Sequence, residues 1–500
     1  MALFLKPHGD GGAAFVASVL LLFANVVLGG ATRTGYLADV LLQALSLPFL
    51  ALAVWLWLDR LTARRPAWSF GLVCGAALAA TGLVIALAQF LPLFGAPGWE
   101  GISARIVAAG GQGLDGVAWT GSSSVDPAAS LAALPAVLPP LALFLLVALL
   151  DEEGRLRFAG WAVVIGLVAL LLGILQVMQG PASGLRFFEI SNRSESVGFF
   201  ANRNHFAAQL YVTFLLAVAW FVGRGDRVLG HRGASTPKVI WLAAAFSLGV
   251  LVLAGIALAR SRAGILLLLV ALAGVVVMAP LILSVLRGRG AAPHRVRSLV
   301  LAVLVGVVLL VGQLGADRFL GRFGGGLVDQ LRAVLNETTF QAAREALPFG
   351  TGLGTFTAVF PVYEGPATLS PQYVNRAHDD WLEFFLETGL PGMVLVACFL
   401  AWFGERIYRL WIASGATGGL RLLVLQQCAS LAVLLLMLHS LVDYPLRTAA
   451  MFAYFAACCA LMTPGAAAAR LARDTRAPAA APPPRQSRRP ARTSTAGGRT

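Results

Sequence analysis

The chain has 500 residues, of which 58% are hydrophobic and only 12% are charged, and its mean hydropathy is +0.78. Because about a quarter of the residues in a soluble globular protein are charged, this composition excludes an ordinary soluble domain. The apolar residues come in blocks of roughly 20, the helix length that crosses a hydrocarbon core of ~30 Å. The fold class we expect is an all-α polytopic membrane protein.

In chain order, these blocks predict about 12 transmembrane helices. The expected spans are 13–30, 37–58, 68–94, 129–150, 159–178, 206–223, 239–259, 263–286, 298–314, 382–403, 422–440 and 446–463. A large loop, 315–381, separates the ninth span from the tenth. We read the first block as a retained helix, because no small-residue cleavage site precedes the next span.

The chain therefore divides into three regions. Residues 1–178 hold the N-terminal transmembrane helices, and 179–463 form a second membrane region that contains the loop 315–381. Residues 464–500 are rich in Pro, Ala and Arg, which predicts a disordered basic tail.

Basic residues predict the orientation in the membrane. They collect in alternate connections, around Arg60, Arg155, Arg224, Arg287 and Arg406. The positive-inside rule places these connections and both termini in the cytoplasm, and the loop between the ninth and tenth spans on the outer side. The net charge of +14 is thus mostly topogenic. We expect the tail to contact anionic lipids and expect no nucleic-acid partner.

Two polar clusters precede the large loop on the expected outer side. In the first, Arg203 and Asn204 stand at the start of a helix, where backbone N–H groups favour an anion but where asparagine also serves simply as a cap. In the second, Arg260 and Arg262 flank Ser261 in a tight turn between two spans. Both a phosphate ligand and contact of the arginines with lipid headgroups remain open for this turn.

The large loop contains an amphipathic stretch, 327–347, which includes Arg332 and is predicted to lie on the membrane surface. A glycine-rich segment, 350–354, follows. No strand precedes it and no Gly-Lys-Ser/Thr follows, so it does not read as a nucleotide site. We expect a turn that lets the backbone approach either a ligand or a neighbouring helix.

His378 opens the tenth helix, two residues after Arg376. Asp379, Glu383 and Glu387 follow at i, i+4 and i+8, which predicts one acidic face. The alternative role of the acidic residues in the first turn is to satisfy the helix dipole. Ionisable residues at the end of a membrane span are costly and tend to mark function.

A further polar group ends the eleventh span, where Asp443 follows His439 and is expected to orient another polar side chain. The five cysteines all lie inside predicted spans without metal-ligand spacing, so neither a disulfide framework nor a zinc site is expected. Arginine forks bind phosphate oxygens bidentately, and a histidine can remove a proton from a hydroxyl. These residues together suit transfer from a lipid-linked pyrophosphate to a hydroxyl acceptor.

Over roughly 190–445 the chain resembles the O-antigen ligase and polymerase superfamily. The resemblance rests on Gly198-Phe199-Phe200-Ala201-Asn202-Arg203-Asn204-His205-Phe206, Ser261-Arg262-Ala263-Gly264, Pro348 to Tyr363, and Arg376-Ala377-His378-Asp379-Asp380-Trp381-Leu382. It implies that 179–463 is the catalytic region. It also implies a bacterial inner-membrane protein with its active site on the periplasmic face.

The resemblance implies a metal-independent, inverting glycosyl transfer without a cofactor, from an undecaprenyl-pyrophosphate-linked glycan. The acceptor would be a glycan, the lipid A core or a protein hydroxyl, in O-antigen or exopolysaccharide assembly. His378 is the implied general base, and Arg262 and Arg332 the implied pyrophosphate ligands. Further expected donor-binding residues are Arg203, Arg260 and Arg376, and supporting residues are Asn204, Asp379, Glu383 and Asp443.

Two departures from the family pattern stand out. Asp379 occupies the position after the histidine where many members have Asn, and the helix before the glycine-rich segment lacks the tryptophan that many members carry. The competing reading is a lipid-linked glycan flippase. Transporter folds usually show internal repeats and polar, broken helices at mid-membrane. Here no repeat is apparent and the polar residues collect toward one side. A scaffold role would leave the arginines unexplained.

Overall fold

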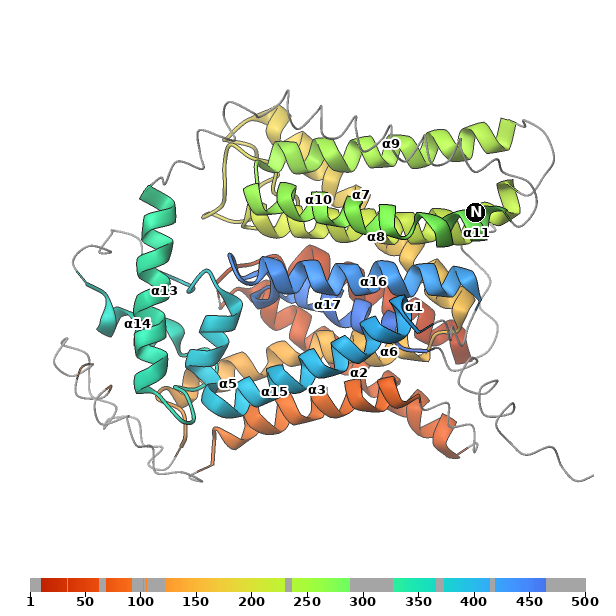
Figure 1. Ribbon diagram of the computed structural model, residues 1–500. Coiled ribbons are helices and arrows are strands. Elements are labelled where there is room, and N and C mark those ends of the chain that lie inside the picture. The colour runs from red at the N-terminus through yellow and green to blue at the C-terminus, as the bar shows by residue number, and fades with distance from the viewer. Residues whose placement is uncertain are drawn as a thin grey trace, which may run out of the picture.

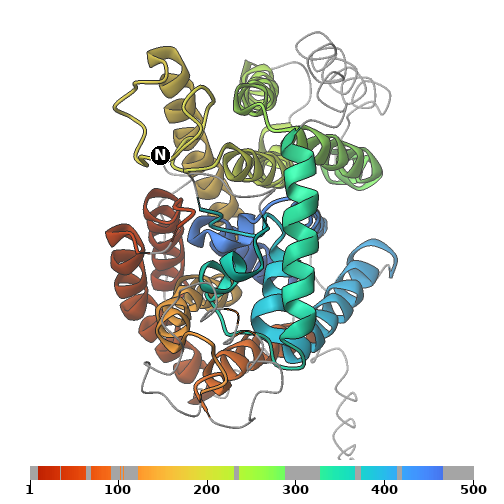
Figure 2. The same cartoon turned by 90° about the vertical axis from the view of Figure 1, so that its left-hand side faces the viewer.

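The computed structural model describes residues 10–33, 35–62, 69–91, 102, 105, 122–229, 236–287, 327–365, 373–413 and 419–464. Every regular element within these residues is a helix. Figure 1 shows the long helices running side by side, while α13 (Leu327–Glu345) crosses them at one end. Figure 2 views this end directly, with α13 in front and the other helices seen nearly end-on. We call it the site end.

The first half of the bundle is formed by α1 (Asp10–Leu28), α2 (Leu37–Thr62), α3 (Phe70–Ala88), α5 (Pro127–Ala133), the 3-10 turn η2 (Leu134–Val137), α6 (Leu138–Leu149) and α7 (Glu152–Gln179). The second half contains α8 (Arg203–Leu229), α9 (Thr236–Ala259), α10 (Arg262–Val277), α11 (Ala279–Arg287), α15 (Asp380–Trp411), α16 (Leu420–His439), the 3-10 turn η3 (Pro445–Arg447) and α17 (Ala449–Met462). The short helix α14 (Phe356–Tyr363) lies beside α13 at the site end (Figure 1).

Among the described residues, nine helices are long and apolar enough to cross a membrane, which makes this an integral membrane protein. Helices α10 and α11 form a tenth candidate, bent by 54°. The expected count of 12 is not confirmed. The span predicted at 298–314 lies outside the described residues, and the last predicted span is a helix of only 14 residues, α17.

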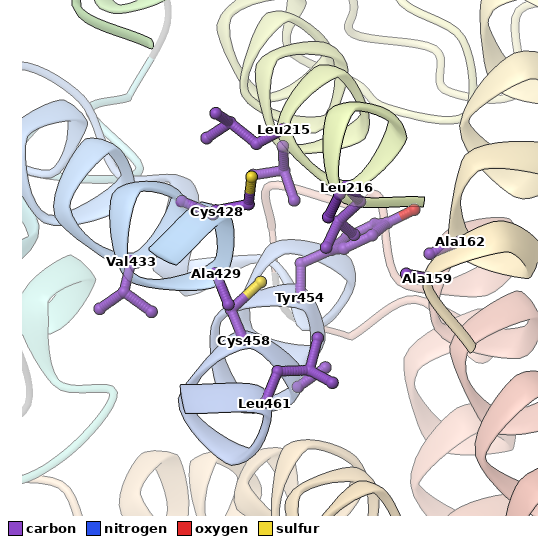
Figure 3. Close-up of a cluster of buried hydrophobic side chains, with 14 of the residues drawn as sticks. Ala159, Ala162, Leu215, Leu216, Cys428, Ala429, Val433, Tyr454, Cys458 and Leu461 are labelled. Carbon is purple, nitrogen blue, oxygen red and sulfur yellow. The ribbon is translucent and has the colours of Figure 1, made fainter. Parts of the chain in front are cut away.

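The core lies where α8, α16 and α17 meet. Figure 3 shows Cys428 of α16 and Cys458 and Tyr454 of α17 in one buried cluster with Leu215 and Leu216 of α8. The two cysteines are free and fully buried, as expected for small packing residues. The packing of α16 against α8 and α17 fixes the position of the end of α16, and of the turn that follows it, at the site end.

Helix α15 is broken at Gly389, whose backbone (φ 57°, ψ −146°) is non-helical. The break leaves the carbonyls of Leu386 and Glu387 without hydrogen-bond donors from the helix itself. Backbone N–H groups of the glycine-rich segment donate to these carbonyls instead. Thr351 N–H donates to Leu386 O, and Gly352 N–H donates to Glu387 O, both at 2.9 Å. The glycines therefore let the backbone approach a neighbouring helix, which is one of the two roles that the sequence left open.

Gly350 is the tightest point of this approach. Its φ is +79°, and a Cβ built there would lie 2.6 Å from Glu387 C and Gly389 N. We expect Gly350→Ala to lower the free energy of unfolding by about 1–3 kcal/mol or more, because both the left-handed backbone and the backbone contact oppose a side chain. Gly404→Ala in the same helix α15 is the control, since nothing lies within 4 Å of its Cβ. Equal thermal unfolding temperatures for the two variants in the same detergent would contradict this account.

Candidate active site

The central feature of the site end is a pairing of His378 with Asp443. His378 precedes α15, Asp443 lies in the turn between α16 and α17, and His378 Nδ1 is 3.2 Å from Asp443 Oδ1. The carboxylate is 1% exposed, whereas the histidine side chain is 28% exposed. Since a carboxylate only accepts, Nδ1–H is the donor. In the neutral imidazole with this tautomer, Nε2 carries no proton and can accept one.

The segment 198–206 completes the surroundings of Asp443. Asn204 Nδ2 donates to Asp443 Oδ2 at 2.5 Å, and Asn202 Nδ2 donates to the same oxygen at 3.3 Å. Asn202 also lies 3.4 Å from Nε2 of the buried His205. The predicted supporting residues Asn204 and Asp443 thus meet at the predicted base, although 239 residues separate them.

Hydrogen bonds and nearby charge define the state of the Asp443 carboxylate. Burial alone would raise its pKa, but the hydrogen bond from His378, together with the positive charge that His205 and His378 carry when protonated, holds the pKa well below its usual range. Asp443 is therefore ionised at neutral pH. Tyr444 packs edge-on against His378 with ring centroids 4.9 Å apart, and burial followed by the Asp443 charge raises its pKa to about 12. It stays a neutral phenol.

The acidic face of α15 differs from the expected one. Asp379 is the N-cap, and its Oδ1 accepts the Leu382 N–H at 3.0 Å, so it does not share a face with Glu383 and Glu387. Asp380 takes that place. Asp380, Glu383 and Glu387 are all buried, and all three face Arg447. Burial, partly offset by the hydrogen bonds of the cap, raises the pKa of Asp379.

Arg447 is the residue that sequence reasoning missed. Its Nη1 donates to Glu387 Oε2 at 2.6 Å, and its Nε lies 3.5 Å from Glu383 and 3.7 Å from Asp380. Although burial opposes its charge, the three carboxylates raise the pKa of the guanidinium. The only signal in the sequence is a lone arginine two residues after Pro445, in a short break between two apolar blocks.

Two of the predicted donor-binding arginines are held by carboxylates of the protein. Arg376 donates to Glu383 Oε1 at 2.8 Å, and Arg203 donates to Glu195 Oε1 at 2.7 Å. The other oxygen of Glu383 accepts the Ala377 N–H at 2.9 Å. In the structure, Arg376 and Glu383 therefore hold the backbone segment that carries His378.

The remaining three predicted arginines come from α13 and from the turn between α9 and α10. Arg260 is exposed with φ 51°, and Arg262 is half-buried at the first position of α10, after the N-cap Ser261. Helix α10 packs against α16, the helix that leads to Asp443. Arg332 on α13 is half-buried. Among the described residues, no hydrogen bond or ion pair joins Arg260 or Arg332 to His378.

The described residues contain no group of three or more His, Cys, Asp or Glu side chains that could hold a metal ion. At this end of the bundle, the described arginines and histidines are the available positive and proton-accepting groups. This arrangement can bind an anion and can accept a proton at His378 Nε2.

A comparison with known protein families matches the part of the chain that contains His378. Residues 247–397 match the sequence model of the family described as O-antigen ligase. This region is an O-antigen ligase-type domain of the O-antigen ligase/polymerase superfamily. The chain has no significant match among curated proteins.

The O-antigen ligase match confirms the family expected from the motifs, over a narrower range than the 190–445 of the resemblance. It includes His378, Arg262 and Arg332, and it ends before Asp443. In the sequence, Asn204 lies before the matched segment and Asp443 lies after it. At the level of the family, the protein is a membrane enzyme of the glycan ligase or glycosyltransferase type.

Proposed function

We propose that this protein transfers a glycan from an undecaprenyl-pyrophosphate-linked donor to a hydroxyl acceptor in envelope polysaccharide assembly. The observation that carries the proposal is the pairing of a partly exposed His378 with the buried carboxylate of Asp443. A histidine oriented and charge-stabilised by a carboxylate is suited to act as a general base. The match of 247–397 to the O-antigen ligase family supports the same reaction class.

The proposed step moves one proton and exchanges one C–O bond for another. His378 Nε2 takes the proton of the acceptor hydroxyl while its oxygen attacks the anomeric carbon from the side opposite the donor pyrophosphate. The bond from the anomeric carbon to the pyrophosphate oxygen breaks, so the configuration inverts and undecaprenyl pyrophosphate leaves. Asp443 stabilises the imidazolium that forms. Arg262 and Arg332 would balance the growing charge on the pyrophosphate, so that a metal ion is not required.

The proposal places the site end on the periplasmic face of the inner membrane, with both termini in the cytoplasm. This side follows from the distribution of basic residues along the sequence.

Ligase and polymerase reactions share the donor and the chemistry, and differ in whether the acceptor is a lipid A core or a growing glycan. Helix α13 lies across the site end (Figures 1 and 2), with Leu331 and Val334 each 42% exposed. Its exposed apolar side chains suit contact with the membrane surface.

Glycan profiling of the source bacterium tests the function. A deletion strain should accumulate lipid-linked glycan and lose the mature polysaccharide, and the wild-type gene should restore it. The length of the product then separates a ligase from a polymerase. Accumulation of donor on the cytoplasmic leaflet alone would instead favour the flippase reading, because the donor would then fail to cross the membrane.

Arg262→Lys tests the donor-binding part of the proposal. A lysine keeps the charge but replaces a bidentate fork by a single point, so we expect transfer to fall about 10- to 100-fold. The control is Arg344→Lys on α13, an exposed arginine at the same end of the bundle. Transfer would be measured in membranes from the deletion strain with matched protein amounts. Equal rates for Arg262→Lys and the control would remove Arg262 from the pyrophosphate site.

A further inference from the structure

We propose that Asp380 is a positioning residue, whose buried carboxylate fixes the turn carrying Asp443 against the segment carrying His378. This inference rests on the proposed function, in which His378 and Asp443 act as a pair. It concerns a residue that the motifs did not single out for any site role.

The first observation is the backbone of His378. Its φ is +57°, a left-handed conformation that is uncommon for a residue with a side chain. Such a conformation is strained and persists only where the surroundings impose it. On one side, the Ala377 N–H is held by Glu383 Oε2 at 2.9 Å. On the other side, Asp379 and Asp380 begin α15. His378 is thus placed between two anchored residues.

The second observation is what Asp380 binds. Its N–H donates to Ser440 O at 2.9 Å, and its Oδ2 accepts the Ser440 hydroxyl at 2.7 Å and the Leu446 N–H at 3.0 Å. Ser440 and Leu446 stand on either side of Asp443 in the chain. A single carboxylate therefore ties both ends of the Asp443 turn to a point two residues from His378.

The third observation is the burial of this carboxylate. Asp380 is 7% exposed, so it cannot meet a bulky glycan directly. Its Oδ1 has no hydrogen-bond partner and faces Arg447 Nε at 3.7 Å. An amide in its place could keep the two bonds to Oδ2 through its carbonyl. Its NH₂ group would then face the guanidinium of Arg447, so that two donors would oppose each other. Asp380→Asn therefore disturbs the anchor without leaving a cavity.

The first test compares kinetics per folded molecule for Asp380→Asn and Ser440→Ala, which removes one of the two donors to Oδ2. The probe is the lipid-linked glycan already present in membranes of the deletion strain. Because a shift of about 1 Å in catalytic geometry can lower a rate about 100-fold, we expect kcat to fall about 10- to 100-fold for Asp380→Asn. KM for the donor should stay within about twofold. Asp151→Asn, which alters the N-cap of α7, is the control and should leave both constants unchanged.

A double-mutant cycle with Asp443→Asn then asks whether Asp380 acts through Asp443. Once the Asp443 charge is gone, adding Asp380→Asn should lower kcat by much less than it does alone, because the two residues serve one geometry. Full additivity of the two effects would overturn the proposal. So would a loss of folded protein with normal kcat per folded molecule in both Asp380→Asn and Ser440→Ala. If Asp380→Asn fails to fold, Ser440→Ala carries the comparison.

A readout without glycan transfer separates this inference from the proposed function. The rate at which diethyl pyrocarbonate modifies His378, followed by mass spectrometry of the peptide, depends on the surroundings of the imidazole. We expect Asp380→Asn to change this rate in the same direction as Asp443→Asn. A rate equal to that of the wild type, with Asp443→Asn altered, would overturn the positioning role. If the modification rates change as expected but the wild-type protein transfers no glycan, the proposed function fails and the positioning role stands.

Discussion

His378→Ala is expected to lower glycan transfer by about 10²- to 10⁴-fold, the usual contribution of a general base. The imidazole is 28% exposed, is bound to the buried carboxylate of Asp443, and can accept a proton, which the arginines of the site cannot. The folded protein should persist, because the His378 side chain is 28% exposed and is not buried in the core. The measurement is the transfer rate in membranes of the deletion strain, at equal amounts of inserted protein.

His378→Gln sharpens this test. Its amide can still donate to Asp443, but it cannot take a proton from a hydroxyl. We expect it to be as inactive as His378→Ala, with the same thermal unfolding temperature as the wild type. Substantial activity in His378→Gln, beside an inactive alanine variant, would show that His378 orients other groups and is not the base.

Arg447→Met should have the largest effect on stability. The guanidinium faces Asp380, Glu383 and Glu387, which are all buried. Removing one partner of a buried ion pair leaves charge without compensation and typically costs about 3–5 kcal/mol. We therefore expect a sharply lower yield and unfolding temperature. Because Glu387 makes the shortest contact with Arg447, the double variant Arg447→Met/Glu387→Gln should recover part of the loss.

Arg409→Met is the matched control for Arg447→Met. Arg409 also pairs with a carboxylate, Glu405, but its side chain is 60% exposed. Exposed pairs contribute about 0–1 kcal/mol, so this variant should unfold close to the wild type. Thermal unfolding of both variants in one detergent and lipid mixture decides the matter. Equal stability of the two would mean that Arg447 does not hold the acidic face together.

The sequence was sufficient to predict the membrane class, the family and the meeting of distant motifs, because these follow from apolar block length and from motif order. It placed Asp443 and Asn204 in support of His378, and the structure brings all three together. It assigned Asp379 to the acidic face, where the structure has Asp380. Neighbouring residues on a helix point about 100° apart. The sequence leaves the start of a helix uncertain by one or two residues, so it does not fix which side chain lies on a given face.

Tertiary contacts account for the other differences between the predictions made from the sequence and the structure. Nothing near Arg447 in the sequence indicates that its partners lie 60 to 67 residues earlier in the chain. The glycine-rich segment could have met a ligand or a helix, and only the break at Gly389 decides between them. The bend between α10 and α11 coincides with Pro280, a recognised cause of kinks that block length alone ignores.

The most direct test of the central claim measures release of undecaprenyl pyrophosphate together with glycan transfer in the same membranes, in the presence of a metal chelator. We predict that the wild-type protein releases one lipid pyrophosphate for each glycan transferred, and that His378→Ala releases none. Full release and transfer by His378→Ala would contradict the assignment of the base. Loss of wild-type activity in the chelator would contradict a transfer that relies on arginine alone for the leaving pyrophosphate.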